Sequence, residues 1–268
     1  MCGIFAYTGK ESAGPILLDG LKILEYRGYD SAGIYTEKLG VVKAVGEVEN
    51  LRKKIGQENL ENSGVFGITH TRWATHGEPT EKNAHPHSDC TKNIHLVHNG
   101  IIENYKELKE KLTSLGHTFS SDTDSEVLAH LIEENLKKEK DFEKAVVKSL
   151  KEVTGTYGLA IVNLLEPGKI ITARKGSPIA VGIGKGENFI ASDSSPILRH
   201  TRDVIYLSDG EIAIITADSY VVKNLDFVTL DRCPEKIEWN AEEAQKEGYD
   251  HFMIKEIMNG PDVIRNAL

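Results

Sequence analysis

The chain has 268 residues, 40% hydrophobic and 27% charged, a composition typical of a globular protein with ample core. Its formal net charge of −9 argues against a general binder of nucleic acid or acidic membranes. Three scattered cysteines, Cys2, Cys90 and Cys233, are too few for a disulfide framework and favour a reducing compartment, which we expect to be the cytoplasm. The sequence contains neither an apolar run of membrane-spanning length nor a signal-peptide pattern.

The first part of the chain mixes strands and helices. In chain order, the apolar patterns predict a strand at residues 4–8, a helix at 12–26, a strand through Ile34 and Tyr35, a strand at 41–45 and a short helix at 48–55. A strand at 65–72, a long loop at 73–89 and a strand at 93–98 follow. Asn99-Gly100 is predicted to end this last strand. Amphipathic helices follow at 104–115, 125–138 and 142–153.

From Gly155 onward the pattern changes to short, closely spaced strands. They are predicted at residues 157–162, 169–173, 180–183, 188–191, 204–207, 211–215 and 220–223. This spacing favours an antiparallel meander and not βαβ units. Taken together, these elements predict an α+β protein that is mainly antiparallel sheet, with helices packed on its outer faces.

Cys2 becomes the N-terminal residue if Met1 is removed. It then carries a nucleophilic thiol together with an α-amine, a base with a pKa near ~8. Such a residue can supply its own general base, as N-terminal threonines do. Taken alone, Cys2 is also compatible with an ordinary buried cysteine.

Two charged residues stand at ends of predicted elements. Arg72 ends a buried strand and enters an irregular loop, where its guanidinium can clamp a carboxylate or simply extend to water. Asp124 precedes a helix, where a carboxylate is most often a cap but can also pair with an ammonium group.

Asn99-Gly100 has two interpretations as well. It is a common hairpin turn, or an oxyanion hole made of the Asn amide and the Gly backbone N–H. Residues 83–87, taken alone, are interpreted as a plain proline-stiffened surface loop. A thiol, an oxyanion hole, a carboxylate clamp and an ammonium partner together describe acyl transfer on an amino acid with an attackable carboxamide, and glutamine is the obvious one.

Longer motifs carry a resemblance to a known family. They are Met-Cys-Gly-Ile at the start, Glu-Tyr-Arg-Gly-Tyr-Asp-Ser at 25–31, Arg-Trp-Ala-Thr-His-Gly at 72–77, Asn-Ala-His-Pro-His at 83–87, His-Asn-Gly-Ile-Ile-Glu-Asn at 98–104 and Gly-Glu-Asn-Phe-Ile-Ala-Ser-Asp at 186–193. From Cys2 to Leu268 the chain resembles the N-terminal half of the glutamine–fructose-6-phosphate aminotransferases, which are class II glutamine amidotransferases.

The resemblance implies an N-terminal-nucleophile hydrolase fold, a four-layer αββα sandwich with two mainly antiparallel sheets. It implies a glutaminase domain at residues 2–230, a linker at 231–250 and the start of a truncated sugar-isomerase domain at 251–268. This chain would hydrolyse L-glutamine, and only the missing half would bind fructose 6-phosphate. No cofactor is expected. The isolated domain is expected to be a monomer and the full-length enzyme a homodimer.

The resemblance also assigns roles to single residues. Cys2 forms a γ-glutamyl thioester, and Asn99 and Gly100 stabilise the oxyanion. Arg72 binds the α-carboxylate of glutamine and Asp124 its α-amino group. By the same resemblance, the glutamine pocket is lined by Thr75, His76 and Gly77, and His85 lies beside it. Trp73 matches the residue that gates an ammonia channel in this family.

Four alternatives remain open. A metal site is suggested by clustered His70, His76, His85, His87, Cys90, His95 and His98, although their spacing matches no zinc motif, so we expect none. A nucleotide loop at residues 182–186 lacks the P-loop context, and a hairpin turn is favoured there. The chain could instead bind glutamine as a sensor without turnover, or serve a class II amidotransferase with another acceptor, such as a phosphoribosyl or aspartyl substrate.

Overall fold

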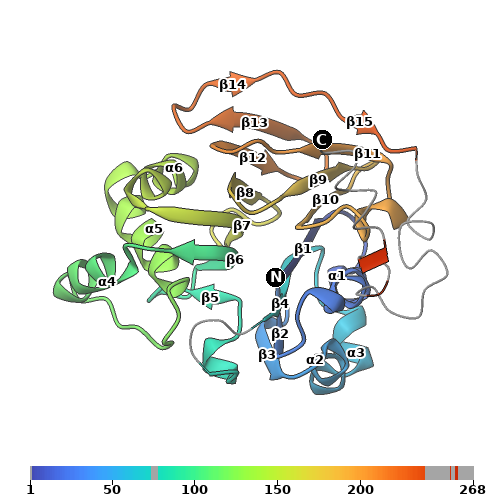
Figure 1. Ribbon diagram of the computed structural model, residues 1–268, viewed down its shortest axis with the longest axis horizontal. Coiled ribbons are helices and arrows are strands. Elements are labelled where there is room, and N and C mark those ends of the chain that lie inside the picture. Colours follow the sequence, from blue (N-terminus) through green and yellow to red (C-terminus); the bar gives the residue numbers. More distant parts are fainter. Residues whose placement is uncertain (1, 74–77, 239–253, 255–256, 259–268) are drawn as a thin grey trace.

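The computed structural model describes residues 2–73, 78–238, 254 and 257–258. Two sheets form its centre (Figure 1). The first has the strand order β15 (Glu235–Lys236), β11 (Asp203–Tyr206), β9 (Ala180–Ile183), β10 (Asn188–Ala191), β1 (Gly3–Thr8), β4 (Phe66–Arg72), β2 (Ser31–Thr36) and β3 (Gly40–Val45). The second has the order β14 (Thr229–Leu230), β13 (Tyr220–Asn224), β12 (Glu211–Ile215), β8 (Ile170–Lys175), β7 (Gly155–Asn163), β6 (Ile94–Ile102) and β5 (His87–Ser88).

Helices cover the outer faces of both sheets (Figure 1). The first sheet is covered by α1 (Ala13–Ile23), α2 (Val48–Ile55) and α3 (Gln57–Glu61), and the second by α4 (Tyr105–Ser114), α5 (Glu126–Glu139) and α6 (Phe142–Glu152). Short 3-10 turns η1 (Glu25–Arg27), η2 (Glu81–Asn83) and η3 (Ile197–Arg199) lie in the connections. The predicted αββα sandwich is confirmed, and its named strands pair antiparallel.

Three apolar cores hold these four layers together. Strand β1 is apolar throughout because both of its faces are buried. Phe5 and Tyr7 pack under α1, while Ile4 and Ala6 face the second sheet. Side chains alternate across a strand, so a strand buried on both faces reads as a continuous apolar run. This double burial fixes β1 as an interior strand of its sheet. Cys2, the residue before β1, therefore lies where this interior strand begins.

Two predictions about the strands are wrong. Strand β6 does not stop at Asn99-Gly100 but continues to Ile102, because Asn99 pairs with Gly158 and Gly100 with Tyr157 on the long neighbouring strand β7. Gly100 has a φ of +133°, a conformation that glycine adopts readily, and the pairing continues through it. The strands after Gly155 also do not form one meander, since β7, β8, β12 and β13 belong to one sheet and β9, β10 and β11 to the other.

The structure adds elements that the sequence did not indicate: α3, β5, β14 and β15. Of the predicted linker at 231–250, the described part carries β15, which pairs with β11. The remainder of the linker and most of 251–268 lie outside the described residues. Among the described residues, no helix has the length and apolar character needed to cross a membrane.

Candidate active site

Cys2 lies directly before β1, at the centre of the first sheet. The pairing of Gly3 with Thr71 brings the start of β1 beside the end of β4. The Gly3 N–H donates to Thr71 Oγ1 over 3.2 Å, and the Ile4 N–H donates to Ser192 Oγ over 3.0 Å. These bonds satisfy the backbone donors that follow Cys2 and hold it in place.

The thiol of Cys2 is in an environment that keeps it protonated. Burial raises its pKa above the ordinary 9.0. A hydrogen bond from the backbone of Trp73, whose N–H lies 3.3 Å from Sγ, opposes this rise, as do the positive charges of the chain N-terminus, Arg72 and Arg27. Because the thiolate is the reactive form, this cysteine needs a base to act at neutral pH.

The side-chain amide of Asn99 faces Cys2 from the second sheet. Its Nδ2 donates to the carbonyl oxygen of Cys2 over 3.0 Å, and its Oδ1 lies 3.0 Å from His70 Nε2. Burial lowers the pKa of His70 to about 3, so the ring is neutral and Nε2 is the donor to Asn99. An amide nitrogen carries two protons, and the bond to Cys2 uses one of them.

Arg27 fixes the carbonyl of Cys2 from the other side. Its Nε donates to that oxygen over 3.1 Å, and its Nη1 lies 3.6 Å from Asp193. The next residue, Gly28, approaches the backbone so closely that a Cβ there would lie 2.7 Å from the Trp73 nitrogen. The motifs at 25–31 and 186–193 and the end of β4 therefore build the support under Cys2. The sequence did not indicate this role for Arg27, His70, Thr71 or Ser192.

Two adjoining cavities share Cys2, Trp73 and Gly100. One has a volume of about 250 Å³ and also contacts Arg27, Asn99, Ile101, Thr156, Ser177 and Pro178. The other is polar and contacts Arg72, His85, His98, Thr123, Asp124 and Ser125. The structure thus brings together a thiol, a guanidinium and a carboxylate that lie far apart in the sequence.

Arg72 and Asp124 are both largely buried, with exposed fractions of 5% and 7%. Burial lowers the pKa of Arg72, and opposite charges counteract the effect, that of the Cys2 thiolate where it forms and those of Asp124 and Asp30. Asp124 is held by the Ile102 N–H, which donates to Oδ2 over 2.7 Å. One oxygen thus anchors Asp124 to the end of β6.

The loop at 83–87 packs against the segment that carries Asp124. The Asp122 N–H donates to Asn83 Oδ1 over 3.0 Å, and Thr123 Oγ1 lies 3.0 Å from His87 Nε2. The ring of His85 stacks on His70 at 4.2 Å between centroids. Burial lowers the pKa of His85 well below its usual range. The loop that looked chemically plain in the sequence forms a wall of the polar cavity.

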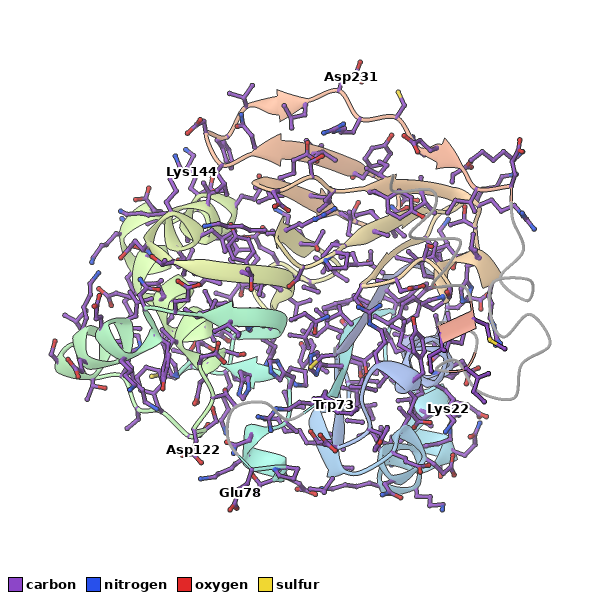
Figure 2. The ribbon with its side chains drawn as sticks, in the orientation of Figure 1. Lys22, Trp73, Glu78, Asp122, Lys144 and Asp231 are labelled. Atoms are coloured by element: carbon purple, nitrogen blue, oxygen red, sulfur yellow. The ribbon has the colours of Figure 1, made fainter. Side chains whose placement is uncertain are left out.

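Trp73 lies at the mouth of both cavities, 46% exposed, with its ring edge-on to Tyr29 at 5.9 Å. Figure 2 labels it between the two sheets, above Glu78 and Asp122. The predicted pocket residues Thr75, His76 and Gly77 lie outside the described residues. The hairpin predicted at 182–186 is confirmed, because it joins β9 to β10 and Gly184 donates to the carbonyl of Glu187 over 2.9 Å.

Comparison with known proteins identifies the kind of domain. Residues 70–199 match a family model described as a glutamine amidotransferase domain. The whole chain is 52% identical to glutamine–fructose-6-phosphate aminotransferase (isomerizing) of Thermococcus kodakarensis, covering 45% of it, and 48% identical to that of Chlorobaculum tepidum, covering 44%. The chain spans less than half the length of these curated relatives.

A solved structure supports the same relationship. The glutamine phosphoribosylpyrophosphate amidotransferase of B. subtilis, complexed with ADP and GMP, superimposes with a TM-score of 0.72 at 26% identity. The match covers 85% of this chain and 50% of that one. The two folds therefore correspond over nearly all of the described domain.

Proposed function

The chain belongs to the glutamine amidotransferases, and from that premise we propose that it hydrolyses L-glutamine to glutamate and ammonia through a thioester on Cys2. The observation that carries this proposal is the shared cavity of Cys2, Arg72 and Asp124. An amino acid presents a carboxylate and an ammonium at one end. A buried cation and a buried anion beside a nucleophile match that pattern.

Removal of Met1 provides the base in this proposal. The α-amine of Cys2 takes the thiol proton, directly or through a water, because the burial that raises the thiol's pKa leaves little thiolate at neutral pH. The sulfur then attacks the glutamine carboxamide carbon. The resulting oxyanion accepts hydrogen bonds from Asn99 Nδ2 and from the Gly100 N–H.

The remaining steps regenerate the enzyme. The tetrahedral intermediate collapses, its C–N bond breaks, and the α-ammonium returns the proton so that ammonia leaves. Water then adds to the γ-glutamyl thioester, the C–S bond breaks, and glutamate is released with the thiol restored. The cavity around Cys2 is polar on the side of Arg72 and Asp124 and less polar toward Ile101 and Pro178. We propose that ammonia leaves past Trp73 on the less polar side.

In a longer protein, the ammonia would be transferred to fructose 6-phosphate by a second half. This acceptor rests on the activity for which relatives that match along the whole chain are named. A cytoplasmic location is proposed as well, because all three cysteines are free.

The experiment is glutamate release from glutamine, with an intact-mass measurement that reports whether Met1 is present. We expect release by the processed chain and none by Cys2→Ala, which should still bind glutamine. Because the thiol contributes little to ground-state binding, loss of binding in that variant would indicate damaged folding. If the processed chain binds glutamine without releasing glutamate, the sensor alternative replaces this proposal.

A further inference from the structure

A second cluster of reactive side chains lies away from Cys2. It consists of Cys90, His117, His130 and Glu133, and no two of their donor atoms are more than 4.8 Å apart. None of the four contacts either cavity at Cys2. The histidines in this cluster differ from the ones that the sequence grouped with Cys90, because the fold brings His117 and His130 to it from elsewhere.

Five of the six distances among the four donor atoms are close to the edges of a coordination tetrahedron, and the sixth, between Cys90 Sγ and Glu133 Oε2, is at most 4.8 Å. Cys90 Sγ lies 3.3 Å from His130 Nδ1 and 3.6 Å from His117 Nδ1, and the two Nδ1 atoms are 3.2 Å apart. Glu133 Oε2 lies 3.3 Å from His117 Nδ1 and 3.8 Å from His130 Nδ1. Tetrahedral zinc with bonds of about 2.0–2.3 Å places its ligand atoms about 3.3–3.8 Å apart.

The outward-facing nitrogens of both histidines point to carboxylates. His117 Nε2 lies 3.5 Å from Glu134 Oε2, and His130 Nε2 lies 3.7 Å from Glu126 Oε1. The carboxylate nearest each far nitrogen attracts its proton and favours a lone pair on Nδ1, as in metal-bound histidines. The 3.7 Å contact of His130 is too long for a hydrogen bond and leaves its Nε2 without a hydrogen-bond partner among the described residues. Both Nδ1 lone pairs, a sulfur and a carboxylate then converge on one point, an arrangement that a cation stabilises.

From this geometry we infer that the cluster is a structural zinc site. One thiolate, two imidazoles and one carboxylate suit Zn²⁺, and four protein ligands leave no open position for catalysis. Binding converts the Cys90 thiol to a thiolate and releases its proton to solvent. His130 and Glu133 are three residues apart and therefore share one face of α5. Both histidines are buried, while Cys90 is exposed and gives the ion a way in.

The site would connect three segments around the polar cavity. Cys90 follows β5, His117 lies between α4 and α5, and His130 and Glu133 lie in α5. The Cys90 N–H already donates to Glu133 Oε2 over 3.0 Å. Because His87 lies in β5 and Asp124 just precedes α5, zinc would hold together two of the segments that form the cavity wall.

The test is the metal content of the whole chain, purified without a histidine tag and desalted into metal-free buffer after incubation with one equivalent of Zn²⁺. We expect one Zn²⁺ per chain by mass spectrometry of the metal, and with Co²⁺ an absorption band from cysteine sulfur. Cys90→Ser should lose both signals, and the matched variant Cys233→Ser, which changes the other exposed cysteine, should keep both.

A further variant probes the outer carboxylates. Glu134→Gln should weaken zinc binding about 10- to 100-fold against a chromophoric chelator, as removal of such a partner does in other zinc sites. Circular dichroism confirms that each variant is folded. Less than 0.1 equivalent of metal in the wild-type chain, or zinc retained in folded Cys90→Ser, would overturn the inference and leave a hydrogen-bonded network. The measurement reads metal directly, so it does not depend on glutaminase activity.

Discussion

His70 Nε2 and Asn99 Oδ1 lie 3.0 Å apart between the two sheets. Because burial lowers the pKa of His70 to about 3, the ring stays neutral across the whole working range of pH. It therefore donates to Oδ1 and turns the Asn99 Nδ2 toward Cys2. His70 is a positioning residue for the proposed oxyanion hole, and it acts through a neighbour without touching the substrate.

This relationship predicts the kinetics of two His70 variants. His70→Leu should lower kcat about 10- to 100-fold with little change in KM, because the oxyanion contact forms only in the transition state. His70→Gln, whose amide N–H can donate to Asn99, should recover part of the loss. Steady-state glutamate release checks both. Equal kcat in the two variants, or a change confined to KM, would assign His70 a merely structural role.

The sequence indicated the proposed reacting groups better than their supports. Cys2, Arg72 and Asn99 were singled out because a thiol, a guanidinium and an amide each have recognisable chemistry, and the structure places the last two at the cavities that Cys2 lines. His70, Arg27 and Ser192 were missed because they act through Cys2 or Asn99 across the sheets. Long-range contacts of this kind leave no local pattern, unlike the apolar spacing that predicted α2 and β9 with their observed bounds.

Asn99-Gly100 shows the limit of local patterns. The pair is a strong turn signal, yet its partner strand β7 is long enough to pair on both sides of it. Tertiary pairing therefore overrides the turn preference. The zinc cluster shows the same limit, since its four ligands come from three separate segments and only His130 and Glu133 are close in sequence.

The proposed clamp of Arg72 and Asp124 on the two charges of glutamine predicts changes in substrate binding. Arg72→Ala and Asp124→Asn should each raise KM about 10- to 100-fold with kcat less affected, because these contacts exist in ground and transition states alike. An Asn side chain keeps an oxygen for the Ile102 N–H, so the fold is preserved. The matched control is Asp122→Asn, which removes an exposed carboxylate paired with Lys82 on the same segment and should leave KM unchanged. A fall in kcat alone would contradict the clamp.

The raised pKa of Cys2 predicts how its reactivity depends on pH. In the form that keeps Met1, burial favours the neutral thiol, so the thiolate fraction rises with pH and reaches one half only above 9.0. Iodoacetamide alkylation of Cys2, followed by peptide mapping, should therefore keep accelerating through pH 9. In the form that lacks Met1, kcat/KM for glutamine should instead reach its plateau near pH ~8, the ordinary pKa of an α-amine, which is about one pH unit below the thiol's range. If alkylation of the Met1 form reaches its plateau below pH 8, the thiol is not suppressed by burial.

The last prediction concerns the close approach between β2 and the loop at 83–87. A Cβ on Gly33 would lie 1.9 Å from the carbonyl oxygen of His85, and backbone cannot yield as a flexible side chain can. Gly33→Ala should therefore cost about 1–3 kcal/mol of unfolding free energy and also raise KM, because His85 contacts the polar cavity.

Gly168→Ala is the comparison for Gly33→Ala. Gly168 has a φ of +77° and open space around it, so alanine there should cost about 1 kcal/mol and leave KM unchanged. Urea unfolding and glutamate release measure both variants. Should Gly33→Ala show the stability loss with an unchanged KM, the loop at 83–87 shapes the fold without shaping the glutamine pocket.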